Sequence, residues 1–336
     1  LSIINGLTSR VDKVANGDGL DIDTCSQVFV SDCFVQSSDD SICLKIEEYG
    51  EKTPSLCRDI TVTNCVTRTT QTAIKLGTGS YGEYRNVVIS NCTVMDGAGG
   101  IGMWTRDGGI IDGVRIDNIT ISQESDAQHG TAFYFRGYRR GKDTPRDGLI
   151  RNVSISNVTA TCHAALFMAG ADCGTFENIT FDNIHFILHG TVARHCAVTP
   201  PVPFHAYAMN DTPFELYVHH ARTLRFHQIR FDWDALANPA WRQAMRLIDV
   251  DGLTVDGFSG RAGGAECETI LLHDVKNAWV RNSLAEAGTK SFLHLQGACG
   301  NIYLSGNDLS RATTAVTRAD EVPASAVTME GNRLLM

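Results

Sequence analysis

The chain has 336 residues, of which 43% are hydrophobic, and a formal net charge of -9 at pH 7. This length and composition allow a large buried core. The negative charge, with acidic and basic residues intermixed, argues against a nucleic-acid partner, and no apolar run approaches membrane-spanning length, which argues against a membrane.

Two acidic motifs come early in the chain. Asn16-Gly17-Asp18-Gly19 is the first, and the pair Asp39-Asp40 follows, with Asp39 placed 21 residues after Asp18. If one coil of a repeating fold separates them, these carboxylates lie about 5 to 10 Å apart on neighbouring coils. Carboxylates that close cannot all ionise independently, so at least one pKa should be raised, which gives a proton donor beside a proton acceptor.

A repeat covers most of the chain from Ser26 onward. Its ten copies are SQVFVSDC at Ser26, RDITVTNC at Arg58, RNVVISNC at Arg85, DGVRIDNI at Asp112, RNVSISNV at Arg151, ENITFDNI at Glu177, RTLRFHQI at Arg222, DGLTVDGF at Asp251, KNAWVRNS at Lys276 and GNIYLSGN at Gly300. The copies start 24 to 45 residues apart. This range suggests a repeat unit of about 25 residues with loops inserted into the longer spacings.

Each copy alternates apolar and polar residues and therefore predicts a short strand with one buried face. Such strands bury that face by stacking in successive coils, so the sequence predicts an all-β, right-handed parallel β-helix of about ten or more coils. The recurrent Asn near the end of each copy should form a ladder that hydrogen-bonds backbone groups at a bend. A leucine-rich repeat and a β-propeller are the competing folds, but the regular Leu spacing and the blade of about 40 residues are missing.

We expect residues 1–336 to form one β-helix domain. The opening LSIINGLTSR has no initiating Met and no signal peptide, so we expect a removed leader, or a cap or earlier coils in the parent protein. Residues 196–213 are proline-rich and predict a long loop, and residues 214–336 predict degenerate C-terminal coils. The 11 Cys fit neither a zinc site nor a disulfide framework and are expected to be buried free thiols.

Residues 15–45 resemble the active-site segment of glycoside hydrolase family 28, the polygalacturonases and their relatives. The family signature Asn-Thr-Asp-Gly corresponds to Asn16-Gly17-Asp18-Gly19, with Gly in place of Thr, and its Asp-Asp pair corresponds to Asp39-Asp40. The phrases AIKLGTGSYGEYRNVVISNC, WTRDGGIIDGVRIDNITI and AFYFRGYRR are also similar to the family. The resemblance is strong to about residue 190 and weaker beyond it.

This resemblance implies a right-handed β-helix that hydrolyses glycosidic bonds with inversion. Asp39 would be the general acid, Asp18 and Asp40 would activate water, and Asn16 would orient these groups or a sugar hydroxyl. The general requirement agrees, because inverting enzymes hold their carboxyl groups roughly 6.5 to 9.5 Å apart. The alternative is that these Asp residues only form turns.

The departures from the family pattern bear on the substrate. Where polygalacturonases have Gly-His-Gly the chain has Gln71-Thr72-Ala73, and their Arg-Ile-Lys corresponds to Gly102-Met103-Trp104. A uronate without a cationic partner is costly to desolvate, so polygalacturonate is a doubtful substrate. Trp104 instead offers an aromatic platform for a neutral or deoxy sugar, unless it is a core residue.

Further candidates for substrate contacts follow from their position after the same repeat anchor. Lys75, Arg106 and Arg136 could form a clamp for a carboxylate or hydroxyl group, although such residues are more often solvated surface charges. Lys45 could lower the pKa of a neighbouring carboxylate. Thr72 replaces the family's His, and Tyr138 lies in a loop that could line the site.

The sequence therefore predicts an inverting glycoside hydrolase acting on a pectin-related or other polysaccharide or oligosaccharide. Exo-action on a neutral sugar or on a decorated pectin oligosaccharide is favoured over endo-cleavage of polygalacturonate. No cofactor and no metal is expected. The alternatives are a non-catalytic carbohydrate-binding β-helix and, less favoured, a polysaccharide lyase. Family resemblance favours a secreted or periplasmic location, and the oligomeric state cannot be inferred from these patterns.

Overall fold

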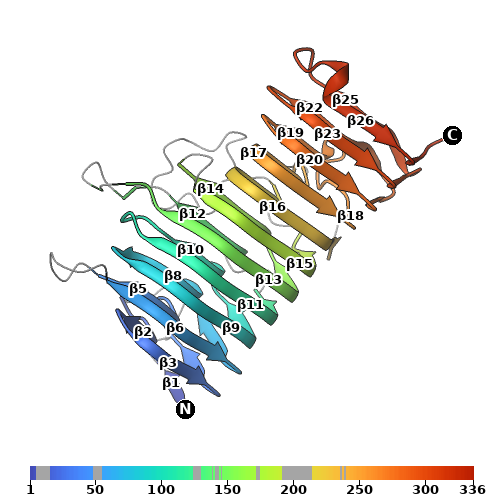
Figure 1. The fold of residues 1–336 in the computed structure, drawn as a ribbon. Coiled ribbons are helices and arrows are strands. Elements are labelled where there is room, and N and C mark those ends of the chain that lie inside the picture. The colour runs from blue at the N-terminus through green and yellow to red at the C-terminus, as the bar shows by residue number, and fades with distance from the viewer. Residues whose placement is uncertain are drawn as a thin grey trace.

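The protein is an all-β, right-handed parallel β-helix, as predicted (Figure 1). The computed structural model describes residues 1–4, 16–47, 55–123, 130–137, 139–140, 144, 146–171, 175–190, 214–234, 237 and 240–336. Residues 196–213, for which a long loop was expected, lie outside these ranges. Within them, successive coils stack along one axis, and the two ends of the chain lie at opposite ends of the solenoid (Figure 1).

The strands form three stacks, one for each side of the coil. Stack I comprises β2 (Leu20–Asp23), β5 (Ile42–Ile46), β8 (Thr72–Ser80), β10 (Gly99–Trp104), β12 (Thr131–Gly137), β14 (Ala164–Gly170), the first parts of β16 (Leu216–Trp233) and β17 (Met245–Asp256), β19 (Glu268–His273), β22 (Thr289–Gln296) and β25 (Ala312–Arg318). Stack II comprises β3 (Ser26–Ser31), β6 (Leu56–Thr63), the first parts of β9 (Glu83–Asp96), β11 (Ile110–Ser122), β13 (Leu149–Cys162) and β15 (Phe176–Leu188), later parts of β16 and β17, β20 (Lys276–Arg281), β23 (Gly300–Ser305) and β26 (Val327–Glu330).

The third side is built from shorter strands and strand ends. Stack III comprises β1 (Ser2–Ile4), β4 (Phe34–Gln36), β7 (Val66–Thr69), the last parts of β9, β11, β13, β15 and β16, β18 (Ser259–Gly260), β21 (Leu284–Ala285), β24 (Asp308–Leu309) and β27 (Arg333–Leu334). Among the described residues the helical structure is a single 3₁₀ turn, η1 (Ala324–Ala326), and no helix is long and apolar enough to cross a membrane.

All ten repeat copies fall in stack II, where their alternation builds the core. In β9, Val87 and Ile89 point inward and are fully buried, whereas Val88 and Ser90, which alternate with them, are partly exposed. Stack I is different, because β10, β12 and β14 are buried at every position. One continuous hydrophobic cluster runs from Ile22 to Ala326.

The predicted ladder of Asn residues is present, with different hydrogen-bond partners from those expected. Asp32, Asn64, Asn91, Asn118, Asn157 and Asn183 all have positive φ, between 52° and 54°. Their amides bond side chain to side chain on neighbouring coils, as in Asn118 Nδ2 to Asn91 Oδ1 at 2.8 Å and Asn183 Nδ2 to Asn157 Oδ1 at 2.7 Å. Asn tolerates the left-handed region better than other side chains do, so one residue type provides both the bend and the ladder.

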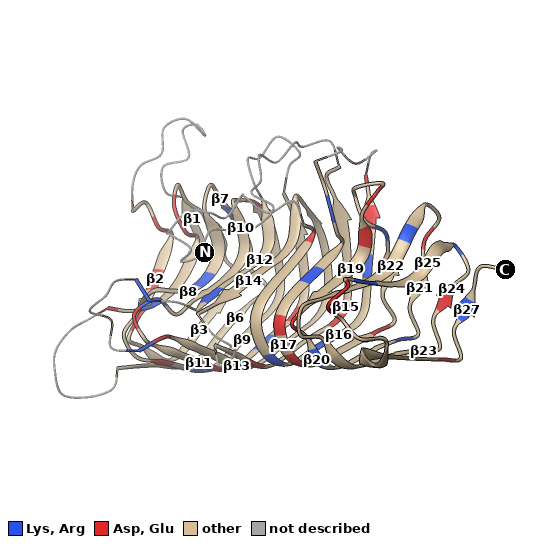
Figure 2. Ribbon diagram, turned by 90° about the horizontal axis from the view of Figure 1, so that it is seen from above, with Lys and Arg blue, Asp and Glu red and all other residues tan. Residues whose placement is uncertain are grey.

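The described cysteines are free and mostly buried, as predicted. Cys33, Cys65 and Cys92 occupy equivalent turns of stack II, and each thiol donates to the carbonyl oxygen two residues earlier at 3.1 to 3.2 Å. Charged residues of both signs are interspersed along the coils (Figure 2).

A second ladder, on the other edge of stack II, has a gap at Gly113. Asn86 donates to Asp59 at 2.9 Å and Asn178 to Asn152 at 2.9 Å, but Gly113, with φ of 75°, stands between Asn86 and Asn152. A surface hollow of about 420 Å³ includes all three residues. A Cβ at Gly113 would meet its nearest atom at an ordinary 3.7 Å, so there is room for a side chain.

Gly113→Asn should therefore fill the gap and donate to Asn86. Gly113→Ala is the control, because Ala adds the Cβ at positive φ without an amide. We expect the Asn variant to exceed the Ala variant in free energy of unfolding by about 1 kcal/mol, the typical net value of one hydrogen bond. Urea unfolding measures this difference, and equal stabilities would show that the ladder amides contribute nothing at this position.

Candidate functional site

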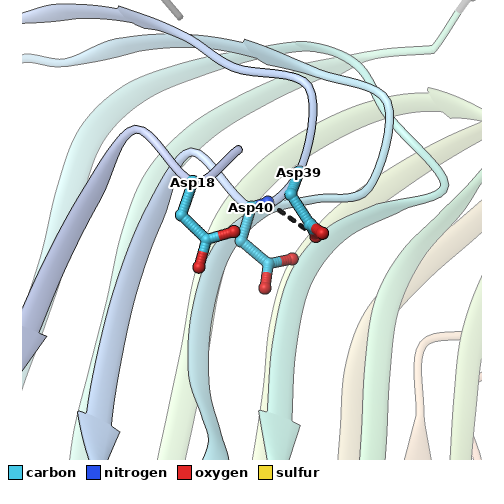
Figure 3. A group of neighbouring side chains, drawn as sticks. All are labelled: Asp18, Asp39 and Asp40. Carbon is cyan, nitrogen blue, oxygen red and sulfur yellow. Dashed lines mark hydrogen bonds between the residues drawn. The ribbon is translucent and has the colours of Figure 1, made fainter. Parts of the chain in front are cut away.

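Asp18, Asp39 and Asp40 meet at the entrance to stack I. Asp18 precedes β2 and Asp39-Asp40 precede β5, and the β2–β5 register pairs Leu20 with Ile42. Gly19 N donates to Asp40 O at 2.9 Å, so the two segments lie side by side. One oxygen from each of the three carboxylates lies within 4.8 Å of the others (Figure 3). The predicted meeting of three acids from neighbouring coils is confirmed.

Close backbone contacts hold the two segments together. Ser38 N and Asp39 N both donate to Gly17 O at 3.2 Å. A Cβ on Gly19 would lie 2.4 Å from Val35 Cγ1 and 2.6 Å from Ser41 O, so this position needs glycine. The glycine after Asp18 in the motif therefore serves the approach of the two coils.

Asp39 is partly exposed and its carboxylate accepts two backbone hydrogen bonds. Asn16 N donates to Oδ2 at 3.3 Å. Asp40 N donates to Oδ1 at 3.0 Å (Figure 3). Asn16 was expected to orient the acidic groups, and the described contact that it makes with Asp39 comes from its main chain. These bonds fix the direction of the Asp39 carboxylate.

Asp40 is 4% exposed and carries the strongest constraints of the three acids. Thr72 N donates to Oδ1 at 3.1 Å, and the Lys75 ammonium pairs with Oδ2. Burial raises the pKa of Asp40, the charge and hydrogen bond of Lys75 offset part of the rise, and Asp39 and Asp18 add to it. The direction agrees with the expectation of a raised pKa in the cluster, but its chief cause is burial, and the repulsion from Asp39 and Asp18 on which the expectation rested contributes less. Thr72 contacts this group through its main chain.

Lys45 binds Asp18 at 2.5 Å and Asp21 at 2.8 Å. Burial lowers the pKa of Lys45, but the hydrogen bonds to these two carboxylates outweigh it and raise the pKa above its usual value. Lys45 therefore stays charged. The pKa of Asp21 is itself raised, chiefly by burial, and Lys45 offsets only part of this rise.

Asp21 was missed in the sequence, although its position contains the signal. It lies outward on β2 and pairs in register with Cys43, which in turn pairs with Lys75. The alternation of LDID therefore places Asp21 on the same face as the other charged groups.

The spacing of the acids is shorter than the sequence argument assumed. Their nearest oxygens lie within 4.8 Å, whereas the carboxyl groups of inverting glycosidases are generally about 6.5 to 9.5 Å apart. The separation by itself therefore gives no support for inversion.

The interpretation of Trp104 as an open sugar platform is wrong in this structure. Its side chain is only 9% exposed. The Lys75 ammonium lies 4.9 Å and the Arg136 guanidinium 5.4 Å from the ring centroid, and Tyr134 packs edge-on at 5.6 Å. The indole faces two cations and does not present a free face to a sugar.

The proposed clamp of Lys75, Arg106 and Arg136 also needs correction. The register pairs Lys75 with Gly102, and Trp104 with Arg136, so Arg106 lies beyond the equivalent position. Arg136 is fully buried and therefore not a solvated surface charge. Arg106 is partly buried, and its carbonyl oxygen accepts a hydrogen bond from Arg140 N at 2.7 Å. Tyr138 lies outside the described residues.

An aromatic cluster covers the outer face of stack I next to the acids, and the sequence did not reveal it. Trp104 begins the cluster, which continues through Tyr134, Phe167, Tyr217 and Phe214, with Tyr134–Phe167 and Phe167–Tyr217 stacked at 5.1 and 5.4 Å. These side chains are buried on the side of the sheet that faces away from the core. The outer face is therefore occupied immediately beyond Trp104.

The oxygens of the three acids are close enough together to hold a metal ion. Among the described His, Cys, Asp and Glu side chains, this is the group with such a geometry. Two of them are already neutralised, because Lys45 pairs with Asp18 and Lys75 pairs with Asp40. The two ammonium groups supply the positive charge that a cation would bring.

The comparison with known families agrees with the geometry. The profile of glycosyl hydrolases family 28 matches residues 2–203, more than half of the chain. The chain belongs to this family. The predicted resemblance is thus confirmed, and the matched segment contains all three acids and both lysines. No curated protein sequence matches the chain.

Several solved structures are similar in fold. Pre-mature gene product 12 of bacteriophage phi29 is 13% identical, with a TM-score of 0.48, over 99% of this chain and 44% of that chain. The tailspike protein gp49 of Pseudomonas phage LKA1 is 12% identical, with a TM-score of 0.48, over 93% and 49%. The A-module of the mannuronan C-5 epimerase AlgE4 of Azotobacter vinelandii is 11% identical, with a TM-score of 0.44, over 94% and 84%. The chain spans less than half the length of the two phage proteins.

The substitution Lys75→Met tests whether Lys75 compensates the buried negative charge of Asp40. Breaking a buried ion pair costs about 3 to 5 kcal/mol when the remaining charge is uncompensated. Without Lys75 the pKa of Asp40 in the folded protein rises further. A carboxyl group whose pKa is raised by folding stabilises the fold at low pH, and this contribution is lost as the pH rises through the folded-state pKa. The loss in unfolding free energy should therefore be larger at neutral pH than near the ordinary pKa of Asp, as measured by urea unfolding at both pH values.

Lys290→Met is the control for this experiment. Lys290 pairs with Glu266, but both side chains are exposed, by 55% and 81%, so its removal should have little effect at either pH. Equal losses for Lys75→Met at both pH values would contradict the compensation of Asp40 by Lys75.

Proposed function

We propose that the protein is a glycoside hydrolase that cleaves a polysaccharide or oligosaccharide at Asp18, Asp39 and Asp40. One observation carries the proposal: three carboxylates from neighbouring coils approach within 4.8 Å in the segment that matches the family. A turn of purely structural Asp residues has no need to gather mutually repelling acids. We also propose that the protein is secreted or periplasmic, because its family membership favours that location.

The roles within the group follow the family correspondence. Asp39 donates a proton to the leaving oxygen, and Asp18 and Asp40 hold and deprotonate the attacking water. The partial exposure of Asp39 is consistent with contact to a glycosidic oxygen. Burial raises the pKa of Asp40, which makes its ionised form a stronger base, and Lys45 and Lys75 hold the two water-binding carboxylates in place.

The charges around the acids favour a neutral or deoxy sugar over plain polygalacturonate. Lys45 and Lys75 are each bound to carboxylates of the protein, and Arg136 is fully buried. A uronate would have to break one of these pairs or remain without a partner, and either is costly. The proposed preference for a neutral sugar therefore rests on the fact that these cations are already paired or buried, and it does not depend on Trp104.

The aromatic cluster favours exo-action. An extended polymer that runs along the outer face of stack I would have to cross its covered part, where the side chains of Trp104, Tyr134 and Phe167 are buried two or more coils from Asp40. A chain end that stops at the acids avoids this obstruction. We therefore place the cleaved bond near the end of the substrate chain.

Asp39→Asn should abolish hydrolysis, because Asn cannot donate the proton; positioned acids contribute about 10² to 10⁴-fold to the rate. Reducing ends released from rhamnogalacturonan, galactan, arabinan and polygalacturonate provide the measurement. Asp112→Asn is the matched control, since Asp112 is ion-paired with Arg151 at 2.8 Å on stack II and should retain activity. Binding without turnover by the wild type would favour the carbohydrate-binding alternative, and an unsaturated product would favour a lyase.

The stereochemistry of the product tests the mechanism separately. If water attacks in a single displacement, the first sugar released has the anomeric configuration opposite to that of the bond cleaved. Proton NMR during early turnover detects this configuration before mutarotation. Release of the retained anomer would rule out the assignment of Asp18 and Asp40 as a water-activating pair.

A further inference from the structure

Two stacked aromatic side chains stand on the outer face of stack II, far from the acids. Trp279 on β20 and Tyr303 on β23 are paired in register. Their ring centroids are 4.5 Å apart with an interplanar angle of 15°. The Trp279 side chain is 45% exposed, whereas Trp104 and Trp241 are 9% and 2% exposed. Trp279 is therefore a surface tryptophan held rigidly by its neighbour.

The free face of the Trp279 indole points along the solenoid axis. One ring face is covered by Tyr303 on the next coil, so the other is directed toward the preceding coil, where the register places Thr254. A threonine side chain is too short to cover an indole. On the far side of the pair, Tyr303 is followed by another threonine, the exposed Thr328. The pair thus has an uncovered aromatic face toward each neighbouring coil.

Hydrogen-bonding groups surround this pair on both edges of the strands. On one edge, Asn301 donates to Asn277 at 2.7 Å, and on the other Arg281 is paired with Asp256 at 2.9 Å. A flat apolar surface bordered by amides, a guanidinium and a carboxylate suits a sugar ring, which has an apolar face and a rim of hydroxyl groups.

A protein partner fits the same surface poorly. The exposed part of the two rings amounts to on the order of 100 Å², whereas each side of a stable protein interface buries about 800 Å². The flanking positions are polar, so the patch cannot extend into an apolar interface of that size. The area and its rim therefore favour a small ligand unit over a second copy of the chain.

We propose that Trp279 and Tyr303 form a glycan-binding platform distinct from the catalytic acids. Phe29, on the coil of the acids, is the first member of the same outward column, and the register carries it through Thr61, Val88, Arg115, Ser154, Thr180, Arg225 and Thr254 to Trp279. Eight coil steps at about 4.8 Å separate Phe29 and Trp279 by roughly 38 Å. A single sugar cannot reach both sites, so the platform holds a remote part of a polymer and raises the local concentration of chain ends at the acids.

The choice of a glycan as ligand rests on the proposed function, but the binding can be tested without turnover. Asp39→Asn serves as the background for all variants, so that the glycan is not consumed. Native electrophoresis in gels that contain rhamnogalacturonan, galactan, arabinan or hydroxyethylcellulose measures retardation. In the gel that retards the background protein, Trp279→Ala should weaken glycan binding by about tenfold or more and so reduce the retardation. Trp279→Tyr, which keeps an aromatic ring, should recover much of the binding.

Phe29→Ala is the matched control. Phe29 lies in the same column and is 78% exposed, but the register places Thr61 beside it and no aromatic ring. Neither substitution changes the charge, so mobility without glycan is unaffected. Phe29→Ala should be retarded as strongly as the background, and thermal unfolding of Trp279→Ala establishes that it is folded.

The results separate this proposal from the proposed function. Retardation that Trp279→Ala abolishes supports the platform whether or not the protein with Asp39 intact releases reducing ends. Unchanged retardation in Trp279→Ala, or none in any gel, overturns it. A change in sedimentation mass in Trp279→Ala would identify a second copy of the chain as the occupant and would also overturn it. With Asp39 intact, Trp279→Ala should hydrolyse short oligosaccharides at the wild-type rate.

Discussion

The structure depends on the parallel register that places each residue directly above its equivalent on the next coil. With neighbouring strands about 4.8 Å apart and side chains alternating between the two faces, one register fixes both the core and the outer columns. The pairing of Leu20 with Ile42 brings Asp18 beside Asp40, and the pairing of Ile42 with Ile74 brings Lys75 to the same place. A slip of one residue in either pair would turn these charges into the core. The register that builds the hydrophobic core therefore also assembles the candidate site.

Within that register, charge balance decides how close the acids can come. Asp40 is almost fully buried, and an unpaired carboxylate there would lose its hydration without compensation. Lys75 offsets part of this cost for Asp40, and Lys45 pairs with Asp18 and Asp21. The acids can therefore gather within 4.8 Å. The same two ammonium groups are bound to carboxylates of the protein, and the proposed preference for a neutral sugar rests on this arrangement.

The sequence revealed the β-helix and the three acids because both leave a local pattern. The repeat copies alternate, since stack II has one face in the core and one in solvent, and the acids sit in short motifs one coil apart. Stack I leaves no such pattern, because β10, β12 and β14 are buried on both faces. Arg106 was consequently placed at a position that Gly102 occupies, and Trp104 was interpreted as exposed. The burial of Trp104 depends on side chains from several coils, which a reading of one coil cannot supply.

Lys75 touches both parts of the site, since its ammonium binds Asp40 and lies 4.9 Å from the centre of the Trp104 ring. An indole reports on nearby charge through the energy of its excited state. Gain or loss of a proton at Asp40 would alter how firmly the ammonium is held, and the emission of Trp104 would respond. The protein thus contains an internal optical probe of the protonation of Asp40, positioned two coils away and requiring no label.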